Sequence, residues 1–428
     1  MPPLDGLRVL DLTRVLAGPY CAMMLGDMGA EVLKIEEPTH GDDTRAWAPH
    51  RDGWSTFFLG LNRSKKSVAL DLKSEDGAAA LRRLIATADV LIENFRPGSL
   101  AKLGFSYEIA AALNPRLVYC SVTGYGQVGP KKDLPGYDAV IQGESGLMDV
   151  TGHPDGPPTR VGVAITDYLA GLYAMNGILL ALRDRDRTGQ GQHVDIALLD
   201  AMTSALALPA GIYFNTGEEP GREGNQHHTL TPYETIEVAD GLVVVAVGNE
   251  RLWKQFCAAV DARDLENHPD YATNTDRMAH RPRLIAELTP RLAKYTRDAL
   301  IERLRAHNVP CAQVRSIGEA LEDPHLRARG MVVDIPHDDL GTLRSLGNPI
   351  RLSRTPAAIH RRPPALGEHN EEILEPLTAD DDSRADPQPV GAITPGVRAE
   401  EAVQAPGQAR LGGKRGLKAP VSGLGVDR

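Results

Sequence analysis

The N-terminal part of the chain, residues 1–125, alternates short apolar runs with stretches of helical periodicity. The runs predict β-strands over 7–12, 31–35, 68–72, 90–92 and 117–122. Pro19 suits the first turn of a helix that Gly29 ends. Further helices are expected over 75–87 and 98–113. Strands that alternate with helices imply parallel pairing in a sheet covered on both faces, so we expect an α/β fold with a Rossmann-like large domain.

The middle of the chain continues this pattern and then changes it. The pattern predicts a buried helix over 168–183, a strand over 193–196 and a helix over 198–215. Two apolar runs, 235–238 and 242–247, flank the pair Asp240-Gly241, which is a hairpin signal. Helices that would cover this hairpin are expected over 250–260, 281–294 and 297–307. This pattern indicates a smaller α+β domain.

These patterns divide the chain into four parts. We place the large domain at 1–215, the small α+β domain at 216–325 and a return segment to the large domain at 326–378. The tail, 379–428, has no aromatic residue and is rich in Gly and Pro. Such a composition cannot bury enough surface to offset chain entropy, so the tail is expected to be disordered.

Charge and cysteine usage narrow the function classes. The 47 basic and 57 acidic residues give a net charge of −10, which argues against general nucleic-acid binding. The longest apolar stretch, 168–182, is shorter than the roughly 20 residues that a membrane span needs, and no signal peptide is visible. The 4 cysteines are far apart, with no metal-ligand spacing. We expect reduced thiols, no metal site, no membrane and a cytoplasmic location.

A Gly-rich motif, Gly124-Tyr-Gly126-Gln-Val-Gly129, directly follows the predicted strand at 117–122. A dinucleotide site needs such a loop to open a helix. Residues 130–136 contain two prolines and form no helical pattern. The motif therefore favours a flexible glycine loop beside another kind of site.

Two further stretches suit an anionic nucleotide. Asn62-Arg-Ser-Lys-Lys66, with Lys73, places four cations close together, although such a run is more often a solvated face. The stretch 94–98 follows a predicted strand, where open α/β sheets bind their ligands. There Phe95 could stack on a base, while a tight turn is the simpler explanation.

Asp167 lies between the apolar segment 161–166 and the predicted buried helix. On spacing alone a helix N-cap is favoured, and capping together with the helix dipole would lower the pKa of this carboxyl group. The same environment would suit a nucleophile, an ionised carboxylate that faces a glycine-lined cleft. No Ser-His-Asp or Cys-His set, Walker A loop or HExxH motif is found at a recognisable spacing.

Seven stretches in chain order resemble the class III CoA-transferases, the CaiB/BaiF family. They are 12–19, 25–36, 62–67, 93–98, 163–167, 188–195 and 366–369. The resemblance implies that Asp167 attacks an acyl-CoA thioester to give an aspartyl anhydride, which CoA then converts to an aspartyl-CoA thioester. An acceptor carboxylate collects the CoA group, and neither a metal nor a redox cofactor is needed.

The resemblance also assigns binding residues. Positions that match the family's CoA contacts are Leu16, Ala17, Leu70, Asp71, Leu72, Lys73, Asn94, Phe95, Arg96 and Lys102. Lys73 and Lys102 suit the phosphates, and Phe95 suits the nucleotide end. The substrate side would consist of Tyr137 and a loop, Gly224, Asn225 and Gln226, that closes over the acyl site.

The chain departs from some family members at a few positions. Glu37 and Pro135 stand where formyl-CoA:oxalate enzymes carry an Arg and a Lys, and Arg45 is a candidate replacement for the Arg. α-Methylacyl-CoA racemases of this family need a His where this chain has Tyr137, and a phenol of pKa near 10 is a poor base.

The stretches 136–140, 145–148 and 162–167 look closest to the succinyl-CoA:glutarate branch, which implies a dicarboxylate acceptor. The family also implies an interlocked, ring-shaped homodimer. Three hypotheses therefore remain: a CoA-transferase between an acyl-CoA and a free carboxylate, an acyl-CoA racemase, or a non-catalytic CoA- or nucleotide-binding protein.

Overall fold

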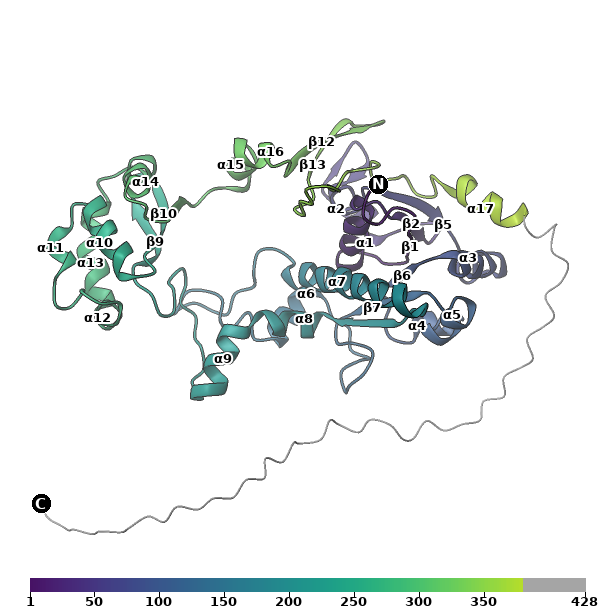
Figure 1. Ribbon diagram of the computed structural model, residues 1–428, viewed down its shortest axis with the longest axis horizontal. Coiled ribbons are helices and arrows are strands. Elements are labelled where there is room, and N and C mark those ends of the chain that lie inside the picture. Colours follow the sequence, from purple (N-terminus) through teal and green to yellow (C-terminus); the bar gives the residue numbers. More distant parts are fainter. Residues whose placement is uncertain (380–428) are drawn as a thin grey trace, which may run out of the picture. The chain divides into compact units, whose positions relative to one another are not determined.

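The large parallel sheet predicted for the N-terminal part is present. The computed structural model describes residues 1–379, so the predicted disordered tail lies outside the described residues apart from Ala379. Six parallel strands pair in the order β5-β2-β1-β6-β7-β8 (Figure 1). They are β1 Arg8–Asp11, β2 Glu31–Glu36, β5 Lys65–Ala69, β6 Val90–Glu93, β7 Val118–Thr123 and β8 His193–Ala197.

Helices cover both faces of this sheet, as expected for parallel strands. Neighbouring residues of β1 point to opposite faces, so Val9 belongs to one hydrophobic core and Leu10 to the other. The first core also contains residues of α1, α7 and α8, whereas α3, α5 and α17 contribute to the second. Their bounds are α1 Ala17–Asp27, α7 Ile165–Thr188, α8 Leu198–Ala205, α3 Glu75–Thr87, α5 Tyr107–Leu113 and α17 Asn370–Ala379.

Helix α7 has 24 residues and is longer than the predicted 168–183. Within residues 1–379 it is the one helix that is long and apolar enough to cross a membrane by length and composition. The expectation that this segment is too short for a span is therefore wrong. Its packing gives it another role, because Ala170, Ala174 and Ile178 are fully buried in the core that it shares with α1.

The region predicted as a small α+β domain contains an antiparallel sheet in the order β11-β10-β9. The hairpin signal at Asp240-Gly241 is confirmed, since Gly241 pairs with Val238 across the turn. A separate hydrophobic core surrounds Trp253, Phe256 and Tyr271. The elements are β9 Tyr233–Val238, β10 Gly241–Ala246, α10 Glu250–Ala259, α11 Arg263–Glu266, α12 Asn274–Ala279, α13 Arg281–Leu292, α14 Arg297–Ala306 and β11 Cys311–Gln313. The boundary residues of the domains stay a prediction.

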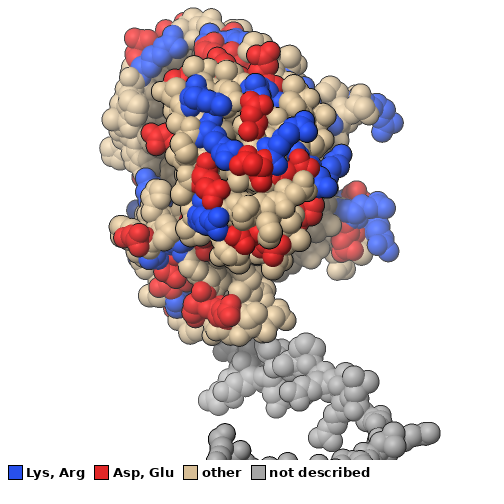
Figure 2. Space-filling view, turned by 90° about the vertical axis from the view of Figure 1, so that its left-hand side faces the viewer, with Lys and Arg blue, Asp and Glu red and all other residues tan. Residues whose placement is uncertain are grey.

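The surface of this region carries both signs of charge. Figure 2 shows Lys and Arg side chains interspersed with Asp and Glu over the face that it displays. Several of them form exposed ion pairs, such as Arg283 with Asp270 and Arg291 with Asp264. This face therefore lacks the single-sign basic surface that nucleic-acid binding needs.

The sequence pattern did not reveal several elements. The predicted helix over 98–113 is divided into α4, Ser99–Lys102, and α5, because Gly104 adopts a left-handed backbone conformation with a φ of 85°. The predicted helix over 198–215 is likewise present as two helices, α8 and α9, Ala207–Thr216. Further elements that were not predicted are η1 Asp43–Ala46, β3 His50–Arg51, β4 Trp54–Ser55, α2 Thr56–Leu61, α6 Asp138–Glu144, α15 Ile317–Leu321, α16 Pro324–Ala328, β12 Val332–His337 and β13 Gly341–Leu346.

The last described segment returns to the edge strand β5. The Asn370 side chain accepts a hydrogen bond from the Ala69 backbone, and His369 bonds the backbone of Ser67. These contacts cover the exposed edge of the large sheet, which would otherwise offer unpaired backbone groups.

Candidate active site

Asp167 lies in the first turn of α7, at the carboxyl-end side of the large sheet. The helix begins at Ile165, and its N-cap, Ala164, offers no side-chain bond. The capping role belongs instead to Asp138 of α6, whose carboxylate accepts hydrogen bonds from both the backbone and the hydroxyl group of Thr166. The interpretation of Asp167 as an N-cap is therefore wrong.

The carboxylate of Asp167 has no hydrogen-bond or ion-pair partner within residues 1–379. Burial, with a smaller contribution from the negative charge of Asp138, raises the pKa of Asp167 to about 7. The expected lowering of this pKa is therefore wrong. The helix dipole favours the anion, but no donor replaces the water that the carboxylate loses. A carboxylate in this setting is poorly solvated, which suits a nucleophile.

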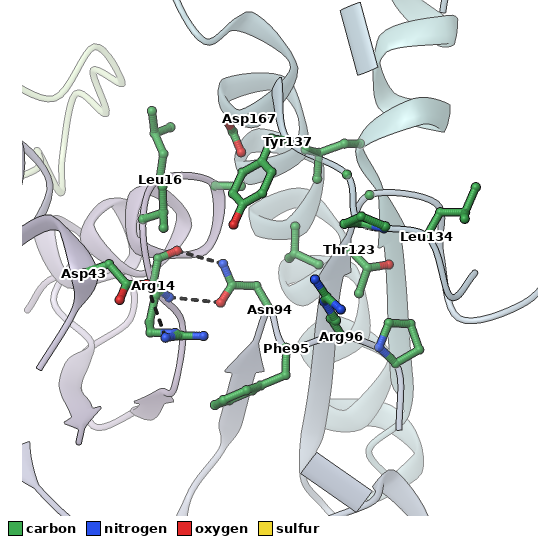
Figure 3. A pocket seen from close by; sticks show the side chains of 18 residues that line it. Arg14, Leu16, Asp43, Asn94, Phe95, Arg96, Thr123, Leu134, Tyr137 and Asp167 are labelled. Atoms are coloured by element: carbon green, nitrogen blue, oxygen red, sulfur yellow. Dashed lines mark hydrogen bonds and ion pairs between the residues drawn. The ribbon is translucent and has the colours of Figure 1, made fainter. Parts of the chain in front are cut away.

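A cavity of about 200 Å³ opens beside Asp167 (Figure 3). Of the residues predicted to bind CoA or substrate, it is lined by Leu16, Ala17, Asn94, Phe95, Arg96 and Tyr137. These residues come from the loops after β1 and β6 and from the segment before α6, at the strand ends where open α/β sheets bind ligands. The fold thus brings together stretches that are far apart in the sequence.

Arg96 and Asn94 differ in whether their polar groups are free to bind a ligand. Arg96 is exposed and has no ion-pair partner among the described residues, so its guanidinium group is available to an anion. Asn94 accepts a hydrogen bond from the Arg14 backbone N–H at 2.9 Å and donates one to the Arg14 carbonyl at 2.7 Å. Both polar atoms of this amide already hold the neighbouring loop in place.

A second cavity, of about 260 Å³, shares Arg14 and Phe95 with the first. It is lined by the predicted residues Leu70, Asp71, Leu72 and Lys73, together with Leu12, Ile35 and Leu103. Apolar walls with an exposed lysine at the rim suit a nucleotide base and its phosphates. Lys102 lines neither cavity, although its neighbour Leu103 does.

The basic stretch 62–66 has neither of the roles considered for it. Arg63 is buried against Asp27, with an N–O distance of 2.7 Å, and Lys65 is buried against Asp11 at 2.8 Å. Lys66 pairs with Glu31 and Glu372. These cations are neutralised inside the protein, so the stretch is neither a solvated face nor a free polyphosphate site. Only Lys73 keeps an exposed side chain at a cavity.

The remaining predicted positions lie elsewhere. Gly224 contacts the segment around His153, and Asn225 donates a hydrogen bond to Thr235. Gly224, Asn225 and Gln226 do not line the cavity of Asp167 in this chain. Arg45 pairs with Glu36 at 2.7 Å, while Glu37 lines the second cavity. Arg45 is therefore committed to an internal pair.

The glycine motif at 124–129 opens no helix, as expected. Gly124 lines the first cavity and lies against Gly136, where a Cβ atom would come within 2.6 Å of the facing backbone. This close approach explains the glycine in terms of packing. Within residues 1–379 no cluster of three or more His, Cys, Asp or Glu side chains could hold a metal ion, and all 4 cysteines are free thiols.

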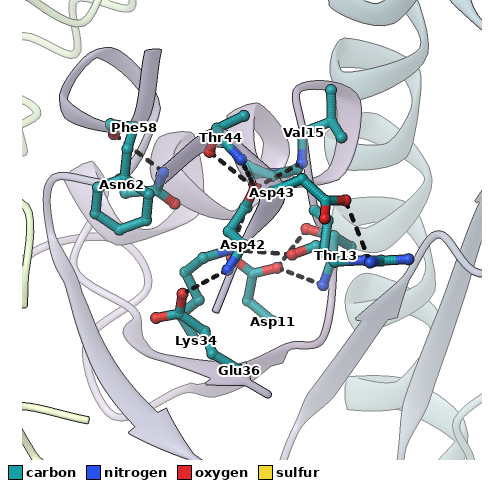
Figure 4. A network of polar contacts seen from close by, with 12 residues as sticks. Asp11, Thr13, Val15, Lys34, Glu36, Asp42, Asp43, Thr44, Phe58 and Asn62 are labelled. Carbon is teal, nitrogen blue, oxygen red and sulfur yellow. Dashed lines mark hydrogen bonds and ion pairs between the residues drawn. The ribbon is translucent and has the colours of Figure 1, made fainter. Parts of the chain in front are cut away.

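Sequence reasoning missed the residues that support the site. Asp138 and Gln142 form a buried pair, with the Gln142 amide donating to Asp138 at 2.8 Å and accepting from the Val161 backbone. Asp11, Lys34 and Asp42 form another buried group below the loop that carries Leu16 (Figure 4). The spacing of these residues along the sequence did not indicate that they form buried groups, because the partners lie on different elements.

Comparisons with known proteins agree with this geometry. The family model described as CoA-transferase family III matches residues 4–370. A succinate–glutarate CoA-transferase of Agrobacterium fabrum is 42% identical over 88% of this chain and 96% of its own length. The succinyl-CoA:glutarate CoA-transferase of Homo sapiens is 38% identical over 89% of this chain and 87% of its own.

A solved structure agrees as well. The crystal structure of a CaiB/BaiF family protein from Brucella suis has 41% sequence identity and a TM-score of 0.80, covering 88% of this chain and 99% of that one. The sequence comparisons and the structural comparison therefore identify the same family. The chain belongs to CoA-transferase family III.

Proposed function

We propose that the protein transfers CoA from an acyl-CoA donor, with succinyl-CoA the preferred candidate, to a free dicarboxylate. The observation that carries this proposal is the unpartnered carboxylate of Asp167, which faces a cavity lined by the residues expected to bind CoA. Relatives named for succinyl-CoA and glutarate, D-citramalate or mesaconate support the substrate class.

In this mechanism Asp167 carries the transferred group in two forms. One Oδ atom of Asp167 attacks the thioester carbonyl carbon, the C–S bond breaks and CoA leaves as a thiolate. The thiolate attacks Cγ of Asp167, which releases the donor acid and leaves an aspartyl-CoA thioester. The acceptor carboxylate attacks Cγ and expels the thiolate, which then takes the acceptor acyl group and regenerates Asp167.

The surrounding side chains have distinct parts in this scheme. Phe95 and the segment 70–73 bind the nucleotide end, with Lys73 near the phosphates. Arg96, the free cation of the first cavity, binds anionic parts of the substrates. No resident metal or cofactor is invoked, because the thioester and the anhydride have comparable reactivity.

The racemase alternative receives less support from the site. None of the 18 residues that line the cavity of Asp167 is a His or a Lys, and Tyr137 occupies the position of the expected His. The cavity therefore offers a nucleophile without the paired base that α-proton exchange needs. Deuterium wash-in at the acyl α-carbon without CoA exchange would support the racemase instead.

We also propose a homodimer and a cytoplasmic location. Helix α9 has no buried residue, although it carries Leu208, Tyr213 and Phe214, of which Phe214 is 80% exposed. Leu180 on α7 is 72% exposed as well. Several exposed large apolar side chains on one helix favour an interface, and a second copy of the chain is the occupant that the family resemblance implies.

A panel of free carboxylates incubated with succinyl-CoA tests the substrate class. We expect new CoA esters, identified by mass, for dicarboxylates of four to six carbons and much less product for monocarboxylates of the same length. The proposal is contradicted if the wild-type protein forms no new CoA ester with any acid. Equal rates with monocarboxylates would remove the dicarboxylate assignment alone.

A further inference from the structure

The loop between β1 and α1 holds an unusual backbone conformation. Val15 has a φ of 73°, in the left-handed region that β-branched residues rarely adopt. Such a conformation is unfavourable and persists only where the surroundings enforce it. Val15 and the next two residues, Leu16 and Ala17, line the cavity of Asp167. The conformation of Val15 therefore sets where the wall of the cavity lies.

Four side chains from outside this loop hold it in place. Asp11 accepts a hydrogen bond from the Thr13 N–H at 3.0 Å, and Lys34 donates one to the Thr13 carbonyl at 2.9 Å. Asn94 bonds both the N–H and the carbonyl of the next residue. Asp42 accepts a hydrogen bond from the Val15 N–H at 3.2 Å. Each of these backbone groups thus has a fixed partner.

Asp42 is itself held rigidly (Figure 4). Its carboxylate pairs with Lys34 at 2.9 Å, and both side chains are 0% exposed. The Thr44 backbone and hydroxyl groups donate to the oxygen that also accepts from Val15. Asp42 therefore presents a fully buried acceptor whose position does not depend on the loop.

Three of the residues in these contacts also line the second cavity. Thr13, Lys34 and Asp42 line the second cavity, where the nucleotide end of CoA is expected, while Leu16 lines only the first. The ion pair thus borders the site where CoA is expected to be anchored, and through Val15 it holds the loop that lines the site of reaction.

We propose that Asp42 is a positioning residue of the transferase. It holds Val15 in the left-handed conformation, so that Leu16 and Ala17 keep their places opposite Asp167 when the thioester is bound. The inference rests on the proposed function, because it takes Asp167 as the reacting group. It also gives a role to Lys34, which lies in a stretch shared with the family but has no predicted contact to CoA.

A glycine at position 15 provides a specific test. Glycine adopts a positive φ without steric cost, so it does not need the bond from Asp42 to stay in place. In Asp42→Asn the paired charge is lost and Val15 can relax, and we expect kcat to fall at least about tenfold. Adding Val15→Gly to that variant is expected to restore at least half of the lost kcat on a logarithmic scale. A purely structural role for Asp42 predicts no such rescue.

The matched control is Asp27→Asn. Asp27 forms a buried pair with Arg63 at 2.7 Å and makes no contact with the loop at 13–17. We expect this variant to unfold at a lower temperature but to keep the kcat of the folded enzyme, and adding Val15→Gly, which also alters the wall of the cavity, should not raise that kcat. The proposal is overturned if Asp42→Asn changes only stability, if the glycine restores nothing, or if the control loses kcat equally.

If Asp42→Asn does not fold, Asp42→Glu is the second variant for the same test. It retains the negative charge beside Lys34 but displaces the oxygen that accepts from Val15, so the same loss and the same glycine rescue of kcat are expected. Retention of full kcat would overturn the proposal. Absence of CoA exchange in the wild-type protein would instead contradict the proposed function, so the two failures are distinguishable.

Discussion

Two groups of shielded carboxylates lie at the same end of the large sheet and have opposite environments. Asp11 and Asp42 are fully buried, and each forms an ion pair with a buried lysine. Asp167 is half-buried and has no donor or cation within the described residues. The difference shows that burial by itself does not define a reactive acid, because the partner decides which protonation state is favoured.

The pKa directions express this contrast. Burial alone would raise the pKa of Asp42, but the charge of Lys34 and the hydrogen bonds from Thr44 outweigh it and lower the pKa to about 2. At Asp167 nothing opposes burial, and the pKa rises to about 7. Asp42 therefore stays ionised and structural at neutral pH, while Asp167 can exchange between a neutral and a nucleophilic form.

Replacing the nucleophile is expected to have the largest effect. Asp167→Ala removes the only group proposed to form covalent intermediates, so CoA exchange should fall by at least about 10³-fold. The measurement is the initial rate of CoA ester formation by mass. Asp149→Asn, which removes an exposed carboxylate paired with Arg222, serves as the control and should keep the wild-type rate. An Asp167→Ala protein that retains the wild-type rate would leave the nucleophile assignment without support.

Neutralising a buried, paired carboxylate should lower the stability of the folded protein. Asp11→Asn leaves Lys65 buried beside a neutral partner, and we expect the free energy of unfolding to decrease by about 3–5 kcal/mol. Denaturant titration at neutral pH measures it. The same change at the exposed pair, Asp149→Asn, should cost less than about 1 kcal/mol. Equal losses at the two positions would contradict the distinction between buried and exposed pairs.

The pH dependence of kcat/KM tests the raised pKa of Asp167. Because the anion of Asp167 is the nucleophile and its pKa is about 7 in the free enzyme, kcat/KM should rise as the pH increases through this value. At pH 5 it should be about 100-fold below the plateau. A kcat/KM that stays constant from pH 5 to pH 8 would show that the carboxylate titrates at its ordinary value.

Removing the charge of Asp167 should produce a smaller, stabilising effect. A carboxyl group whose pKa is raised in the folded state contributes stability at low pH, and that contribution is lost as the pH rises from about 4 to about 7. Asp167→Asn cannot titrate, so its stability relative to wild type should increase over this range by about 1–2 kcal/mol, less than the roughly 4 kcal/mol of the full shift because solvent screens the partly exposed side chain. Thermal unfolding at several pH values measures the difference. A constant difference between the two proteins would contradict the raised pKa.

Much of the fold follows from local sequence. Apolar runs placed β1, β2, β6 and β7 correctly, because these strands are buried on both faces, and the run of β8 was found although this edge strand is only half-buried. Strand β5 begins at Lys65 instead of 68. Its two lysines hide it, since they are neutralised by Asp11 and Glu31 on neighbouring strands, which a local pattern does not reveal. The hairpin of β12 and β13 was missed for a similar reason, because most of its residues are polar or exposed.

The site could be predicted only in part. The family resemblance identified Asp167 and the stretches whose residues line the two cavities. It gave no information on Asp138, which caps α7 from another helix, or on Asp42, which bonds Val15 across 27 positions. The sign of the pKa shift at Asp167 was also wrong, because it depends on donors that only the folded chain can supply or withhold.

Trapping the covalent intermediate tests the central claim most directly. Wild-type protein would be mixed with succinyl-CoA, quenched with borohydride during turnover and digested, and the peptide that contains Asp167 would be analysed by mass spectrometry. We predict that this aspartate is reduced to homoserine in the wild-type protein and that no other carboxylate reacts. Turnover of succinyl-CoA at the normal rate with an unmodified Asp167 peptide would contradict the account.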